Sequence, residues 1–274
     1  MPTDTKHGRY IPPGTDIARI LKAVWRRQRS EVMRAIENGK EPHDLASWDQ
    51  PISKLLNSHL TMYYHKGGDE GVRRIRRAVR NGGKSLKEFG EAGPIVHRRP
   101  TFRPLFVREK AAPVSVTVTD FNVFRPEVVS AVQSASFAFA RSTNATATMQ
   151  LRLALAELRR SLADGLQRGE ALAKLTDRVN AIFANPQRAF AIAMTEASRA
   201  MHTGQLMAAQ QNREIVKGKE WMASSDACEF CQSLDGTTVD LDEPFHVHAA
   251  GGPYATVDVP PGHPHCMCTW VEVL

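Results

Sequence analysis

Apolar residues recur at intervals of three and four positions along most of this chain. That spacing places them on one face of an α-helix. Ile17, Leu21 and Val24 give the first instance. We expect Thr15 or Asp16 to cap their helix, after a Gly- and Pro-containing arm, and the helix to end near Asn38.

The same spacing predicts several further helices. Gly67-Gly68 is expected to separate the first two of them, because glycine has a low helix propensity. The last has the clearest start, where Asn185 can cap the helix and Pro186 can occupy its first turn. The predicted ranges are 47–66, 69–80, 127–142, 147–164, 170–183 and 185–211.

Short runs with strand character follow the helices. They lie at 220–222, 237–241 and 269–274, and Gly- and Pro-rich loops join them. The run 114–119 alternates apolar and hydroxyl residues within a Pro-punctuated stretch, which predicts one isolated strand. We therefore expect a mainly α protein, with a multi-helix body and a small α+β C-terminal module.

Charge divides the chain into two unequal parts. The net charge is +7, yet residues 1–110 hold 23 Lys and Arg against 12 Asp and Glu, while residues 111–274 hold 13 against 17. A basic half favours a polyanion or an acidic protein surface as its partner, and a solvated helix face is the alternative. The candidate nucleic-acid-binding residues are Arg73, Arg74, Arg76, Arg77, Arg80 and Lys84.

These patterns predict four regions. They are a basic helical N-terminal region with an extended arm (1–110), a connector with a strand (111–126), a helical part (127–218) and a β-rich Cys/His module (219–274). No run of 18 apolar residues occurs, so we expect no membrane span. The N-terminus lacks the apolar stretch of a secretory signal, which predicts synthesis and use in a cytosol.

The four cysteines lie in the last region and indicate a metal site. Cys228 and Cys231 form a C-x2-C pair, and His263, Cys266 and Cys268 follow after a long loop. Two thiolates at a turn and a second ligand pair 30–40 residues later are typical of structural Zn²⁺. Which four of the five groups bind stays open, and the alternative is a set of buried or disulfide-linked cysteines without metal.

Several motifs follow one another in the part of the chain from about 125 to 274. They are the segment from Ala189 to Glu196, Gly204, Lys219-Glu220-Trp221, the segment from Asp226 to Cys231, Leu234-Asp235-Gly236, and the segment from Pro260 to Cys268. Taken together and in this order, they resemble the phage head morphogenesis family typified by the Mu F protein. Two positions depart from the family pattern, because Met194 and Met267 stand where the family usually has arginine.

The resemblance implies a minor head, or minor capsid, protein without catalytic activity. Its expected partners are the portal protein, other phage head proteins and packaged DNA. It would lie in the virion, in the head interior or the portal region, after assembly in the bacterial host cytoplasm. The alternatives are a zinc-ribbon DNA nuclease that uses His263 or His265, and a free-standing nucleic-acid-binding module.

Overall fold

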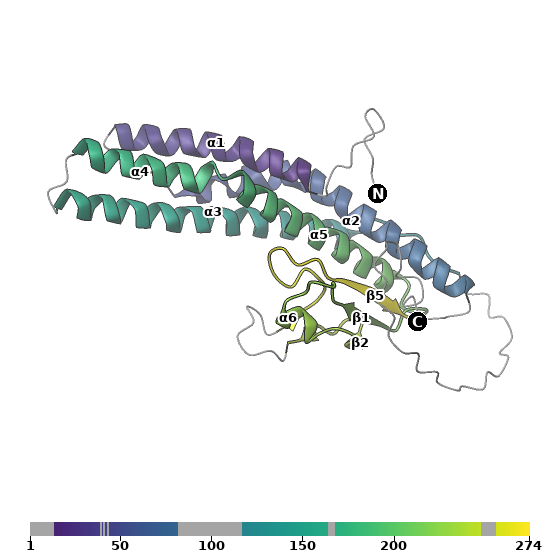
Figure 1. Cartoon of the computed structure of the whole chain (residues 1–274). Coiled ribbons are helices and arrows are strands. Elements are labelled where there is room, and N and C mark those ends of the chain that lie inside the picture. Colours follow the sequence, from purple (N-terminus) through teal and green to yellow (C-terminus); the bar gives the residue numbers. More distant parts are fainter. Residues whose placement is uncertain are drawn as a thin grey trace, which may run out of the picture.

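The computed structural model describes residues 14–38, 40, 42, 44–81, 117–163, 168–247 and 256–274. Long helices lie side by side in an elongated body, and a small strand module packs along one side of it near one end (Figure 1). The helices are α1 (Thr15–Glu37), a 3-10 turn η1 (Leu45–Trp48), α2 (Asp49–Arg80), α3 (Pro126–Ala163), α4 (Arg168–Phe183) and α5 (Pro186–Gln211). The mainly α fold with a small C-terminal strand module is confirmed.

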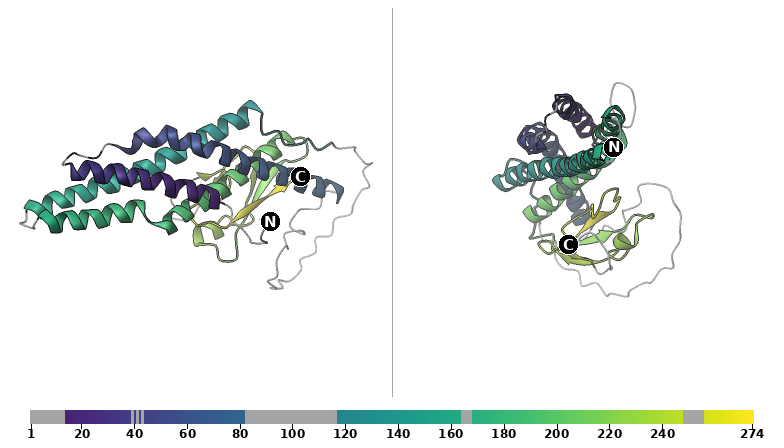
Figure 2. Two further views of the ribbon diagram at one scale, coloured as in Figure 1. Left: turned by 90° about the horizontal axis from the view of Figure 1, so that it is seen from above. Right: turned by 90° about the vertical axis from the view of Figure 1, so that its left-hand side faces the viewer.

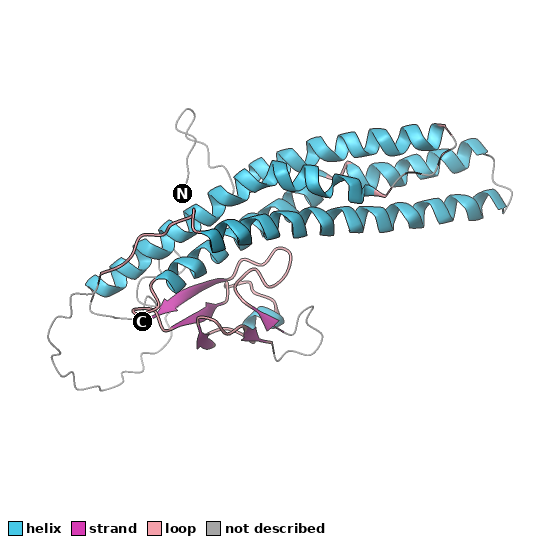
Figure 3. Ribbon diagram, turned by 180° about the vertical axis from the view of Figure 1, so that it is seen from behind, coloured by secondary structure: helices cyan, strands magenta, loops and turns pink. Residues whose placement is uncertain are grey.

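Two antiparallel sheets form the module, together with one short helix, α6 (Glu229–Gln232). The larger sheet has the order β2-β1-β5, and its central strand pairs Trp221 with Trp270. Figure 3 shows both sheets on the same side of the helices. The strands are β1 (Gly218–Met222), β2 (Thr238–Asp240), β3 (Phe245–His246), β4 (Thr256–Val257) and β5 (Thr269–Val273). The sequence predicted β1, β2 and β5 and missed the two-residue strands.

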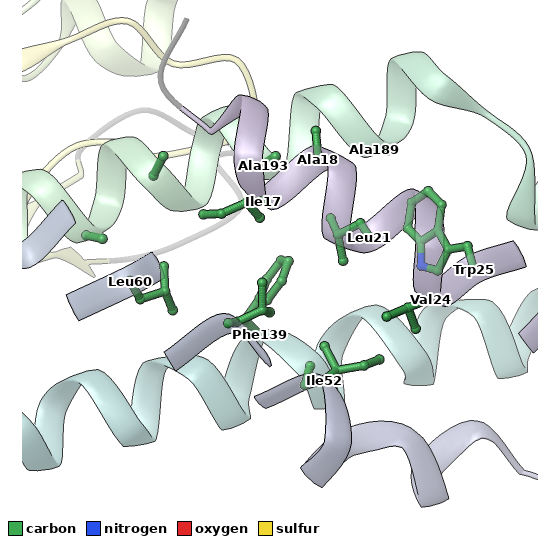
Figure 4. Close-up of a cluster of buried hydrophobic side chains, with 14 of the residues drawn as sticks. Ile17, Ala18, Leu21, Val24, Trp25, Ile52, Leu60, Phe139, Ala189 and Ala193 are labelled. Atoms are coloured by element: carbon green, nitrogen blue, oxygen red, sulfur yellow. The ribbon is translucent and has the colours of Figure 1, made fainter. Parts of the chain in front are cut away.

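Helices from both halves of the chain share one hydrophobic core. Ile17, Leu21 and Trp25 of α1 lie in it beside Ile52 of α2 and Phe139 of α3 (Figure 4). Figure 2 shows the helices gathered into a bundle when viewed along their length. The two lengths of chain on either side of the predicted connector therefore fold against one another.

Of two predicted helix caps, the one at Asn185 is confirmed. The α1 helix begins at Thr15, but Gly14 occupies its N-cap without a side-chain cap hydrogen bond, so the cap predicted at Thr15 or Asp16 is wrong. At α5 the side-chain oxygen of Asn185 accepts a hydrogen bond of 3.0 Å from the backbone N–H of Arg188, and Pro186 occupies the first turn. An Asn cap satisfies one of the backbone donors that a helix start leaves without an intrahelical partner.

The break predicted at Gly67-Gly68 is wrong, because α2 runs unbroken to Arg80. Both glycines are buried in the packing of this helix. A Cβ atom on Gly67 would overlap the backbone of Met201, and one on Gly204 would overlap the backbone of Tyr64. These glycines therefore let the backbones of α2 and α5 approach one another, which compensates for their low helix propensity.

The break predicted between 142 and 147 is also wrong, since α3 continues through it. Asn144 is buried there and joins three helices. Its amide nitrogen donates to Asp49 at 2.6 Å, and its oxygen accepts from the Gln28 amide at 2.9 Å. Because buried polar groups are costly without partners, these bonds stabilise Asn144 at its buried position on the continuous helix.

Some of the segments and residues singled out in the sequence lie outside the described residues. These are most of the N-terminal arm, Lys84 and residues 114–116 of the predicted connector strand. The rest of that strand, residues 117–119, is described and forms no strand. None of the described helices combines the length and the apolar character that crossing a membrane requires.

The contact between Gly67 and the backbone of Met201, where α2 crosses α5, can be tested by substitution. Gly67→Ala should lower the free energy of unfolding by about 3 kcal/mol or more, because the new methyl group meets backbone atoms that cannot rotate away. Gly71→Ala is the matched control on the same helix. Its new methyl group would lie 3.2 Å from Gln205 Cγ and 3.3 Å from Ala208 Cβ and Gln205 Cα, tight contacts without the overlap found at Gly67, and alanine favours the helix by about 1 kcal/mol. Chemical denaturation measures the free energy of unfolding of the two variants. Equal values would contradict the proposed role of Gly67 at the helix crossing.

Candidate metal centre and its interface with the helices

Two short turns carry the candidate metal ligands. Cys228 caps the N-terminal end of α6, and Cys231 lies on that helix, where the Gln232 N–H donates to the Cys228 carbonyl at 2.9 Å. The second turn precedes β5, and its Cys266 N–H donates to the His263 carbonyl at 3.2 Å. Each turn therefore places its donors three residues apart.

The two turns bring their donor atoms together. His263 Nε2 lies 3.2 Å from Cys228 Sγ and 3.2 Å from Cys231 Sγ, and Cys231 Sγ lies 3.7 Å from Cys266 Sγ. The donors form two groups of three that share Cys231, and within each group all atoms lie within 4.8 Å of one another. One group adds Cys228 and His263, and the other adds Cys266 and Cys268.

The imidazole of His263 is oriented to offer a lone pair. Its Nδ1 lies 2.8 Å from the carbonyl oxygen of Pro264. Because that oxygen can only accept, Nδ1 carries the hydrogen and Nε2 is left unprotonated toward the two thiols. The ring also stands edge-on to Phe230 at 6.0 Å between centroids. A carbonyl behind the ring is a common way to fix a metal-binding histidine.

The thiols influence one another's ionisation. Burial raises the pKa of the Cys231 thiol to about 12, and the charge of Cys266 adds to the rise. A hydrogen bond from Cys268 lowers the pKa of the Cys266 thiol to about 5, and the same contact raises the pKa of the Cys268 thiol. The buried thiols thus favour a single negative charge that they share through these contacts. A bound cation would stabilise further thiolates in the same space.

This arrangement fits a metal ion. Thiolate and imidazole donors are the soft and intermediate ligands that transition metals and zinc prefer over oxygen sites. All four cysteines are free thiols, and Cys231, Cys266 and Cys268 are buried. The structure therefore brings together all five donors that the sequence singled out, and these clusters could hold a metal ion.

The comparisons with known proteins concern the same part of the chain. Residues 156–271 match the family model described as phage Mu protein F like protein. This segment is Mu F-like. No curated protein and no solved structure matched the chain.

The Mu F-like segment runs from the last turns of α3 to β5 and contains all five candidate ligands. Two apolar clusters contain most of the buried apolar residues of its module. One surrounds the thiols with Trp221, Phe230, Leu234 and Phe245. The other joins Trp270 to Ile75 of α2 and Leu206 of α5, among others. The module is thus packed on the helices by one cluster and holds the thiols in the other.

A buried ion pair fixes β5 to α2. The side chain of Glu272 is fully buried, and Arg74 Nε lies 3.4 Å from its Oε2. Arg74 also donates to the Trp270 carbonyl at 3.2 Å, and Gln205 of α5 donates to Glu272 Oε1 at 2.8 Å. Burial raises the pKa of Glu272, and the charge of Arg74 opposes that rise. Sequence patterns gave no sign of this pairing.

The arginine cluster predicted to bind nucleic acid is largely engaged within the protein. Arg73 pairs with Glu70 at 2.7 Å, Arg76 pairs with Asp120 at 2.7 Å, and Arg74 faces Glu272. Within the described part of the chain, Arg77 and Arg80 make no ion pair. Nucleic-acid binding by this cluster stays a prediction. Among its described members, Arg77 and Arg80 are the two side chains that no internal ion pair engages.

His202 lies beside this interface and gives it a pH dependence. Its Nδ1 is enclosed without a hydrogen-bond partner among the described residues, and burial, reinforced by the charge of Arg74, lowers the pKa of His202 to about 4. The unfolded chain therefore binds a proton near the ordinary pKa of 6.5 that the folded chain does not bind. Stability should fall as pH decreases from about 6.5 to 4, by at most about 3 kcal/mol.

Thermal melts of wild type and His202→Gln between pH 7 and pH 4.5 measure this contribution. The variant should lose less stability on acidification, because glutamine does not titrate. His246→Gln, which changes an exposed histidine of β3, is the control and should leave the slope unchanged. Parallel pH profiles for wild type and His202→Gln would refute the assignment.

Proposed function

We propose that this protein is a minor head component of a phage or prophage particle. In this proposal it assembles with the portal and other head proteins in the host cytoplasm and stays in the virion, in the head interior or the portal region. The observation that carries the proposal is the match of residues 156–271 to the Mu F-like family model. That match covers most of the module and α5, one of the two helices on which it packs.

The location of the protein in purified particles tests this function. We expect it at low copy number relative to the major capsid protein, and we expect it to copurify with the portal when head proteins are expressed together. A matched expression without the portal is the control. A protein absent from particles, or present in the lysate only as a free species, would overturn the proposal.

We further propose that the metal is zinc and that its role is structural. Around one zinc ion with Zn–S bonds of about 2.3 Å, two sulfurs lie about 3.8 Å apart. The 3.7 Å separation of Cys231 and Cys266 agrees with that value. Cys228 and His263 then complete a set of four with C-x2-C and H-x2-C spacing, and Cys268 lies next to the site as a buried thiol.

Four protein donors leave no open position on the ion. A catalytic zinc keeps one position for water or substrate, whereas a thiolate-rich closed set is typical of a structural site. A structural role also fits the surroundings, because Cys231 and Cys266 belong to the apolar cluster that contains Trp221 and Phe245. We therefore propose a non-enzymatic protein, in which the ion ties α6 to the turn that precedes β5.

Elemental analysis and chelator competition test the ligand set. The purified protein should contain about one zinc per chain, and Cys266→Ser should weaken zinc binding at least tenfold. Cys268→Ser is the matched control, because both thiols are buried to a similar degree and only Cys266 is proposed as a ligand. Equal loss of zinc in the two variants would contradict the proposed set, and a metal-free, fully folded wild type would contradict the site itself.

A further inference from the structure

A row of basic side chains follows the exposed face of α1. Successive members of the row are three, four, one and seven residues apart, a spacing that places all of them on the face opposite the buried apolar residues. Arg26, Arg27 and Arg34, together with Ser30 and Glu31, line a shallow depression on this face. The row, here called the α1 basic face, consists of Arg19, Lys22, Arg26, Arg27 and Arg34.

The charges of this face are not neutralised by the fold. Among the described residues, no carboxylate lies within ion-pairing distance of any of its five basic groups. Glu31 is the carboxylate beside them, and it accepts a hydrogen bond of 3.1 Å from the Trp48 indole. Arg29, one position to the side, is half-buried and donates to Asn180 at 2.6 Å. The α1 basic face therefore keeps five cations for an outside partner, compared with two in the arginine cluster of α2.

The α1 basic face also lies where a large partner can reach it. The α1 helix is on the side of the helical body away from the strand module (Figures 1 and 2). From Arg19 to Arg34 the helix advances about 22 Å, which is about six base pairs of duplex DNA. The surface is thus straight, cationic and of a length that several consecutive phosphates can occupy.

We propose that the α1 basic face binds the phosphate backbone of duplex DNA without sequence preference. Arginine and lysine contact phosphates through charge, and such phosphate contacts carry no sequence information. An anionic membrane fits less well, because Ile17, Leu21 and Trp25 are buried in the core and cannot insert into lipid. This inference goes beyond the proposed head function and does not depend on it.

Salt-dependent binding of the full-length protein to a fluorescent 30-base-pair duplex tests the proposal. Binding should weaken steeply with salt and should not differ between unrelated sequences. Arg26→Gln/Arg27→Gln should weaken binding about tenfold at low salt. It should also reduce the slope of log affinity against log salt by about 1.8, which corresponds to two lost phosphate contacts.

The matched control is Arg77→Gln/Arg80→Gln, which removes the same charge from the exposed end of α2. Glutamine favours helix nearly as well as arginine, so circular dichroism should show both variants folded. The control should lose clearly less affinity than the α1 variant. An equal or larger loss in the control, no DNA binding by wild type, or binding to anionic vesicles but not to DNA would overturn the proposal.

Discussion

The close approach of α2 and α5 is the constraint on which the rest of the structure depends. At Gly67 and Gly204 the two backbones come so near that a single added carbon would overlap a carbonyl group. The contact joins the two halves of the chain, because α2 precedes the connector and α5 leads directly into β1. The strand module can lie against α2 only because α5 carries it there. The absence of a side chain at Gly67 and at Gly204 thus determines where the candidate metal centre lies relative to the helical body.

Burial decides which charged side chains of this protein form internal ion pairs and which stay available on its surface. Arg74 lies on α2 among other arginines, yet its neighbours are a buried carboxylate and a strand carbonyl. Removing one partner of such a pair is strongly destabilising, whereas the pair itself contributes little net stability and more to a unique arrangement. The α1 basic face lacks such partners among the described residues, so its charge acts on the surroundings. The +7 net charge by itself does not distinguish these two uses.

Sequence reasoning succeeded where a local rule decides the structure. The Asn185-Pro186 start, the α1 span and the C-x2-C pair depend on residues close together in the chain, and the structure has all of them. It failed where a distant partner reverses the local rule. Gly67 predicts a helix break, but the helix continues because the backbone of Met201 packs against this glycine. Asn144 lies between two predicted helices, but it is part of α3, where it forms hydrogen bonds with Gln28 and Asp49. The Arg74–Glu272 pair could not be predicted for the same reason, because its members are 198 positions apart in the sequence.

The metal centre and the helix interface are linked through β5. Cys266 and Cys268 immediately precede that strand, and Glu272 lies near its end, so the turn that would hold the ion also sets the position of the carboxylate facing Arg74. The apolar cluster around Trp270 anchors the strand independently of the ion. Loss of metal should therefore loosen α6 and the 263–268 turn first, while β1 and β5 remain paired. A structural ion of this kind acts on the half of the module that the helices do not support.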